Sequence, residues 1–207
     1  MFGINIEYLE KAYHYASRTL RQNDFDCQLC DVCGRTIISD VPKGSDSFVL
    51  EGGKKYPDFL YYGGIGLYFI VSEKAMDVLE QNNITGYNNI SKVDVYRIKN
   101  HQLCKIDEMN YFSLDICGSI DFDLKKMPLK KKNLCQKCGQ FNWSRQRLEL
   151  VETFLDMNSW DGSDLCRIRS APGFTVCCTR LKEHIENNSL SGVVFRSEKK
   201  VFNVFSE

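Results

Sequence analysis

Two short cysteine motifs, each a Cys-x-x-Cys pair followed by glycine, constrain this fold more than any other feature of the sequence. They are Cys30-Asp-Val-Cys33-Gly34 and Cys135-Gln-Lys-Cys138-Gly139. Such a turn places two thiolates about one tetrahedron edge apart, and the glycine lets the backbone fold under a bound metal. We therefore expect the two motifs to meet in space and one structural zinc ion to be bound by Cys30, Cys33, Cys135 and Cys138.

We refer to residues 27–35 as the first knuckle and to residues 134–140 as the second knuckle. The interval between them is much longer than the roughly 15 to 20 residues of an ordinary zinc ribbon, so a structural unit must be inserted between the knuckles. Cys27 forms a further Cys-x-x-Cys pair with Cys30, which leaves open whether Cys27 replaces Cys30 or Cys33 as a ligand. The trailing glycine favours Cys30 and Cys33. A redox pair and ordinary buried free cysteines are the alternatives, although neither flank resembles a thioredoxin-like βαβ unit.

Length, charge and cysteine distribution indicate one compact protein over residues 1–207. The chain is 43% hydrophobic, which suffices for a real core, and its 27 basic and 27 acidic residues cancel. A neutral chain lacks the overall positive charge of most proteins that bind nucleic acid or anionic lipid. The charged N-terminal segment does not resemble a signal peptide, no apolar run could span a membrane, and clustered cysteines argue against a disulfide framework. We expect a cytoplasmic protein with no membrane partner.

The sequence predicts an α+β fold made of two related strand-strand-helix units joined through the double-knuckle element. When the sequence is aligned with itself, residues 58–86 match residues 164–192 without a gap. The two segments share their hydrophobic pattern and the glycine at their end, and Leu79 aligns with Ile185. Each copy reads as two strands, then a helix over 72–83 or 179–188, then a glycine-terminated exit into another strand. The repeat units are expected at about 45–120 and 144–207.

Three other segments each leave two interpretations open. Residues 6–20 have apolar side chains at helical spacing, which favours a helix, although their aromatic and β-branched content also permits a strand. Residues 147–157 fit a strand or a short helix. Residues 123–143 are rich in lysine and read as a solvated connector. Its lysines could instead contact nucleic acid, which makes a zinc-stabilised nucleic-acid-binding adaptor the alternative function.

The sequence contains no motif that pairs a nucleophile with a general base, so we expect no catalytic residues and no enzyme activity. The candidate nucleophiles and bases are Cys104, Cys117, Cys166, Cys177, Cys178, His14, His101 and His184, and no motif pairs them. His184 occupies the helix position that matches Val78, which indicates packing. Four thiolate ligands would also close the coordination shell of the zinc, as in structural sites.

The combined motifs resemble the double-CXXCG motif proteins and the related immunity proteins of bacterial polymorphic toxin systems. The resemblance covers most of residues 25–196 and rests on the two knuckles, on Ile70-Val71-Ser72-Glu73-Lys74 and on Trp160-Asp161-Gly162-Ser163-Asp164-Leu165. In the second repeat, Cys178-Thr179-Arg180 replaces the Val-Ser-Glu helix start of the family. The resemblance implies a non-enzymatic immunity protein that binds and neutralises a cognate toxin domain. It identifies neither the toxin, nor the surface that binds it, nor the oligomeric state.

Overall fold

The computed structural model describes residues 2–6, 15–18, 27–34, 36–38, 47–51, 56–62, 68–98, 110–126, 134–140 and 154–196. The first strands are β1 (Phe2–Ile6), β2 (Tyr15–Arg18), β3 (Cys27–Leu29), β4 (Thr36–Ile38), β5 (Ser47–Glu51), β6 (Phe59–Tyr62) and β7 (Tyr68–Ser72). The later strands are β8 (Tyr87–Ile98), β9 (Tyr111–Ile116), β10 (Ser119–Phe122), β11 (Leu155–Asp156), β12 (Leu165–Ile168), β13 (Ala171–Cys177) and β14 (Val193–Arg196). The helices are α1 (Glu73–Gln81), α2 (Thr179–Asn187) and the 3₁₀ helix η5 (Met157–Ser159).

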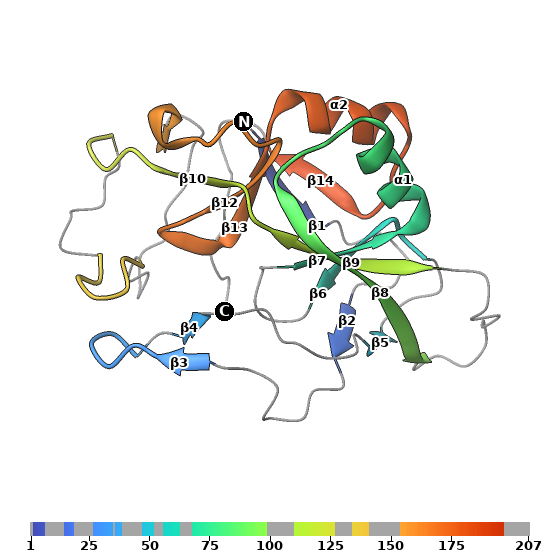
Figure 1. Cartoon of the computed structure of the whole chain (residues 1–207), viewed down its shortest axis with the longest axis horizontal. Helices are drawn as coiled ribbons and strands as arrows, with labels where there is room; N and C mark the ends of the chain where they lie inside the picture. Colours follow the sequence, from blue (N-terminus) through green and yellow to red (C-terminus); the bar gives the residue numbers. More distant parts are fainter. Residues whose placement is uncertain are drawn as a thin grey trace.

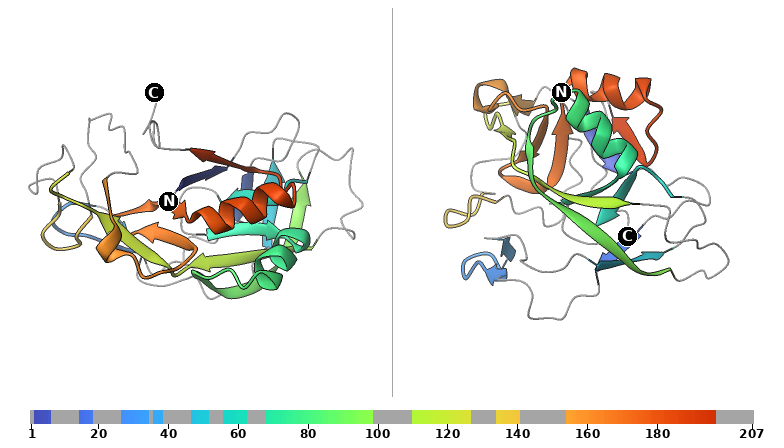
Figure 2. Two further views of the ribbon diagram at one scale, coloured as in Figure 1. Left: turned by 90° about the horizontal axis from the view of Figure 1, so that it is seen from above. Right: turned by 45° about the vertical axis from the view of Figure 1, so that its right-hand side comes forward.

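The strands form three groups, which confirms the predicted α+β class. One sheet has the order β11-β10-β12-β13-β1-β14, a second group closes on itself in the order β2-β5-β8-β9-β7-β6, and β3 pairs only with β4. Helices α1 and α2 lie side by side over the junction of the two larger groups, and the knuckles lie at the opposite end of the molecule (Figures 1 and 2). None of the helices within these ranges is long and apolar enough to cross a membrane.

The two strand-strand-helix units predicted from the sequence are present, and they match element by element. Helix α1 and helix α2 both have nine residues and begin at matching positions of the alignment. Each helix is followed by a residue in the left-handed region, Asn83 with a φ of 49° and Ser189 with a φ of 50°. Leu79 and Ile185 are each 2% exposed and belong to one core. The internal alignment therefore reflects a real structural duplication.

Each unit also has a fourth strand, and the two copies obtain it from different parts of the chain. In the first unit β9 lies between β7 and β8, whereas in the second unit β1 lies between β13 and β14. Phe112 pairs with Val71, and Phe2 pairs with Cys177, which is the residue that matches Val71. The sheet of the second unit is thus completed by a strand outside residues 144–207. The unit bounds of about 45–120 and 144–207 remain a prediction.

Two aspartates join the units by matching sets of hydrogen bonds. Asp58 in the first unit accepts hydrogen bonds from the backbone N–H and the Oγ of Ser191 in the second unit, at 2.7 and 2.8 Å. Asp164 in the second unit accepts the same pair of bonds from Thr85 in the first, at 2.9 and 3.0 Å. Both aspartates are followed by a residue whose N–H donates to the backbone oxygen of that same serine or threonine. We call these the first latch (Asp58–Ser191) and the second latch (Asp164–Thr85).

Glycine is required where the two units approach each other most closely. A Cβ on Gly86 would lie 1.9 Å from the backbone oxygen of Leu165, and one on Gly192 would lie 2.3 Å from the backbone oxygen of Phe59. The two glycines have φ values of 98° and 94°, which disfavour any other residue. The closing glycines noted in the sequence therefore permit the crossing of the units as well as the end of each helix.

The described core has two parts. The larger cluster packs both helices against the strands of both units, and it includes Val71, Leu79, Cys177 and Ile185. The second cluster is built on β10, β11, β12 and β13, with half-buried side chains packed around it, namely Leu124, Leu134, Phe154 and Trp160. Because Leu134 belongs to the second knuckle, this cluster connects the cysteine motifs to the body of the protein.

The helix favoured for residues 6–20 is wrong for the residues of this segment that the structure describes, which follow the strand alternative. Residues 2–6 and 15–18 form the strands β1 and β2, and the residues between them lie outside the described part of the chain. Strand β2 pairs with both β5 and β6, and these tertiary contacts select the strand that the aromatic and β-branched content also permitted. Of residues 147–157, the structure describes 154–157, in which Leu155–Asp156 form β11 and Met157 begins η5.

Candidate metal centre

The structure brings the four predicted ligands together. The sulfur atoms of Cys30, Cys33, Cys135 and Cys138 all lie within 4.8 Å of one another. The Sγ atoms of Cys30 and Cys135 are 3.7 Å apart, and those of Cys33 and Cys138 are 3.6 Å apart. A disulfide would require about 2.05 Å. A tetrahedron of sulfurs about 2.3 Å from a central ion has edges of about 3.8 Å, so the four thiols could hold a metal ion.

Each knuckle folds as a tight turn that carries its glycine in the left-handed region. The N–H of Gly34 donates to the backbone oxygen of Cys30 at 2.7 Å, and the N–H of Gly139 donates to that of Cys135 at 2.8 Å. Gly34 and Gly139 have φ values of 69° and 70°. The two turns therefore present their cysteines in the same way, and Cys27 lies in β3 with its side chain outside the described set.

The local environment favours the thiolate form of one ligand. Backbone N–H groups of Cys138 and then Lys137 donate to the sulfur of Cys135 and lower the pKa of its thiol to about 6. Cys30 is 1% exposed and Cys135 is 9% exposed, so the centre is screened from solvent on this side. Thiolate is the form that binds metal, and a tetrahedral set of four thiolates suits zinc or iron.

The two knuckles also contact each other through their second and third positions. The Lys137 ammonium lies 2.7 Å from the Asp31 carboxylate, and both side chains are more than half exposed. An ion pair in this setting adds little stability by itself, so its main effect is on the charge around the centre. Sequence reasoning did not predict this pair, although Asp31 and Lys137 both lie between ligands and have opposite charge.

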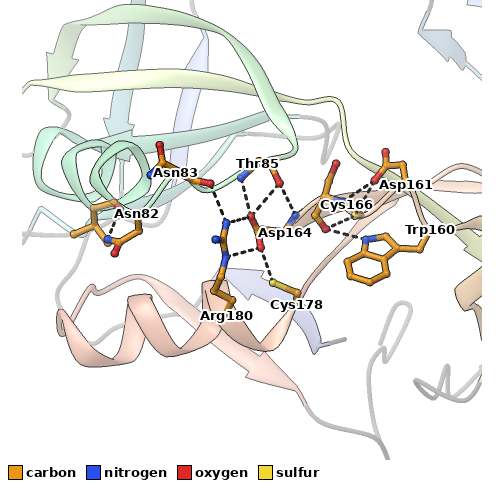
Figure 3. A network of polar contacts seen from close by, with 11 residues as sticks. Asn82, Asn83, Thr85, Trp160, Asp161, Asp164, Cys166, Cys178 and Arg180 are labelled. Carbon is orange, nitrogen blue, oxygen red and sulfur yellow. Dashed lines mark hydrogen bonds and ion pairs between the residues drawn. The ribbon is translucent and has the colours of Figure 1, made fainter.

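A second polar cluster surrounds the second latch (Figure 3). Arg180 donates to Asp164 through Nε at 3.0 Å, and the Cys178 thiol donates to the same carboxylate at 3.0 Å. Burial alone would raise the pKa of Asp164, but the hydrogen bonds from Arg180, Cys178 and Thr85 outweigh it and hold the pKa at about 2. Asp164 is thus an ionised structural group at neutral pH.

The segment singled out by the family resemblance forms a compact turn next to this cluster. The indole N–H of Trp160 donates to the backbone oxygen of Ser163 at 2.9 Å. Asp161 accepts hydrogen bonds from the backbone N–H groups of Ser119 and Ser163 at 2.7 and 3.0 Å. The turn therefore fixes the start of β12 against β10, and its described contacts are structural.

Three of the described cysteines outside the metal centre, Cys166, Cys177 and Cys178, have environments that disfavour the thiolate. Burial raises the pKa of Cys166 to about 12 and also raises the pKa of Cys177. Burial and the hydrogen bond to Asp164 raise the pKa of Cys178. These thiols are protonated at neutral pH and react slowly. His184 is half-buried on α2, Cys117 is exposed, and His14, His101 and Cys104 lie outside the described residues.

No protein-family model matches the chain, and no curated protein matches it either. The resemblance to the double-CXXCG motif proteins therefore stays a prediction from the sequence motifs.

Proposed function

We propose that the two knuckles hold one structural zinc ion. The observation that carries this proposal is the cluster of four thiols, because its sulfur separations of 3.6 and 3.7 Å fit a tetrahedral thiolate site. Cys30, Cys33, Cys135 and Cys138 would hold the ion, and four protein ligands would leave no position for a catalytic water. Zinc would then contribute folding free energy by fixing the β3–β4 hairpin against the second knuckle.

Metal analysis of the purified protein tests this proposal. We expect about one equivalent of zinc per chain, and iron in its place would support an iron–thiolate centre instead. Cys135→Ser should lose the metal and lower the melting temperature. Cys117→Ser is the matched control, because Cys117 is an exposed cysteine outside the cluster. Less than half an equivalent of any metal, or unchanged melting of the Cys135→Ser variant, would contradict the proposal.

We further propose that the protein is a non-enzymatic immunity protein that binds and neutralises a cognate bacterial toxin domain. The support comes from the resemblance through the knuckles and the Trp160 segment, from a thiol cluster suited to a closed metal site, and from the protonated state of Cys166, Cys177 and Cys178. An inhibitor of this kind needs a stable scaffold and a complementary surface, and it needs no catalytic group.

Co-expression with the product of a neighbouring toxin-like gene tests the immunity function. Cells carrying the toxin domain should survive only when this protein is present, and the purified pair should co-elute with sub-micromolar affinity. Failure of both would contradict it. Binding of DNA or RNA with a steep salt dependence, abolished when Lys130, Lys131 and Lys132 are replaced by Ala, would favour the nucleic-acid adaptor. These three lysines lie outside the described residues.

A further inference from the structure

The four clustered thiols make contacts that cross from one knuckle to the other. The Sγ atom of Cys30 lies 3.7 Å from that of Cys135, and the Sγ atom of Cys33 lies 3.6 Å from that of Cys138. The two members of each contact are 105 residues apart in the sequence, so their contact depends on the fold. The first cysteine of each motif therefore faces the first of the other, and the second faces the second.

The two contacts differ in their access to solvent. Cys30 and Cys135, the inner pair, are buried, whereas Cys33 and Cys138, the outer pair, are half-buried. Oxidants in solution react more readily with an accessible sulfur, and an oxidised cysteine that lies beside a second thiol forms a disulfide with it. An oxidant would therefore reach the outer pair first, where each sulfur already has a partner within 3.6 Å.

A disulfide between the outer pair needs a short movement and would keep the knuckles joined. The two sulfurs must approach by about 1.5 Å to reach the bond length of about 2.05 Å. In the described part of the chain, the β3–β4 hairpin shares no strand pairing with the two larger groups of strands. It contacts the second knuckle through the two sulfur contacts and the Asp31–Lys137 ion pair. A covalent bond here would hold the hairpin in place, and it would remove two thiols from the four-thiol cluster.

We propose that Cys33 and Cys138 are a redox-active pair, which hydrogen peroxide converts into a disulfide between the knuckles. Peroxide first oxidises one of the two thiols to a sulfenic acid and is itself reduced to one water. The other sulfur then attacks the sulfenic sulfur, so that the S–S bond forms and a second water leaves. Two thiols and one hydrogen peroxide thus give one disulfide and two waters, with two electrons passing from sulfur to peroxide. The effect of this disulfide on metal binding rests on the proposed zinc site, whereas the disulfide itself does not.

Disulfide mapping of the wild-type protein tests the proposal. The folded protein, as purified and after removal of metal with a chelator, is treated with one equivalent of hydrogen peroxide and then alkylated, unfolded and digested. Cleavage before Asp31 and after Lys137 places the four cysteines of the cluster on separate peptides for mass spectrometry. We expect the Cys33–Cys138 link to be at least about fivefold more abundant than any other link. Metal bound to the purified protein should be released in step with the link.

Two controls separate the folded contact from random oxidation. The same treatment in urea should favour links between cysteines that are close in sequence, because an unfolded chain closes short loops most readily. The folded Cys117→Ser variant, which lacks the exposed cysteine outside the cluster, should form the Cys33–Cys138 link to the same extent as the wild type.

The possible outcomes distinguish this inference from the proposed zinc site. Links within one knuckle, Cys30–Cys33 or Cys135–Cys138, or equal link patterns in folded and unfolded protein, would overturn the redox pair and leave the zinc site intact. A dominant Cys30–Cys135 link would also overturn it, because the buried pair should react last. A protein that holds no metal and still forms the Cys33–Cys138 link would contradict the zinc site and support the redox pair.

Discussion

The two latches offer a matched comparison in which only one aspartate has an arginine partner. Asp58 and Asp164 accept the same hydrogen bonds from the opposite unit, and each also accepts one from the residue before its own helix, Ser72 or Cys178. Arg180 donates to Asp164, whereas the matching residue Lys74 has no ion pair with Asp58 among the described contacts. Replacing each aspartate by asparagine therefore removes a similar set of shared bonds, and the difference between the variants reports the arginine.

The size of that difference follows from the titration of Asp164. A carboxyl group whose pKa falls from its ordinary 3.8 to about 2 on folding gains about 2.4 kcal/mol of stability at neutral pH. The Arg180 side chain is 49% exposed, and solvent screens its charge. We therefore expect Asp164→Asn to cost about 1 to 2 kcal/mol more than Asp58→Asn.

Urea unfolding of the zinc-loaded proteins, followed by circular dichroism, measures this difference. The unfolded carboxyl protonates at a higher pH than the folded one, so the contribution of Asp164 is complete above about pH 5 and is lost as the pH falls towards 2. The gap between wild type and Asp164→Asn should thus be constant between about pH 5.5 and 7.5, where the metal remains bound. Equal costs for Asp58→Asn and Asp164→Asn, or a gap that changes across this range, would refute the reasoning. Arg180→Lys, which gives the second latch the same residue as Lys74 at the matching position, should lose most of the extra stability.

Three further changes test other parts of the fold. Gly86→Ala should lower the free energy of unfolding by at least about 3 kcal/mol, because it adds a clash with the opposite unit to an unfavourable φ. Gly162→Ala is the control and should cost only about 1 to 2 kcal/mol, because Gly162 has a φ of 89° but open space around it. Similar costs for the two variants in denaturant unfolding would contradict the close approach of the units. Leu134→Ala should destabilise by about 1 to 2 kcal/mol and Leu29→Ala by less than about 0.5, measured in the same way, because only the first leucine packs on the core. Deleting residues 1–6 should abolish cooperative melting, because it removes the strand between β13 and β14. A synthetic peptide of the deleted sequence should restore cooperative melting by taking the same place. A deletion variant that melts like the wild type would show that β1 is dispensable.

The sequence predicted the features that depend on local chemistry or on direct repetition. The knuckle pair was predictable because a glycine after each Cys-x-x-Cys identifies matching half-sites, and the units were predictable because Leu79 and Ile185 follow the same pattern. The fourth strand of the second unit was missed because it precedes both copies in the chain. The sequence nevertheless contains a similarity that could have revealed this strand, between Phe2-Gly-Ile-Asn-Ile6 and Phe112-Ser-Leu-Asp-Ile116. Both segments have phenylalanine first, an aliphatic residue third, an amide or acid fourth and isoleucine fifth.

The latches could not be predicted for a different reason. Asp58 and Asp164 align in the repeat, but their partners are in the opposite copy, and an alignment of two segments does not show whether they exchange contacts. The same limit applies to Leu29 and Leu134, which have matching positions and opposite environments. Local pattern determines what a residue can do, and tertiary placement determines which of those roles it has.

The origin of β1 sets an order in which the protein can be completed during synthesis. The strands of the first unit, β6 to β9, are contiguous in the chain, so they can pair as soon as they leave the ribosome. Strand β1 is made before every other described strand, yet its neighbours β13 and β14 come near the other end of the sequence. At about 5 to 20 residues per second, the wait between β1 and β14 lasts about 10 to 40 s. During that time the residues of β1 cannot make their final pairings, so the second unit can be completed only after β14 emerges.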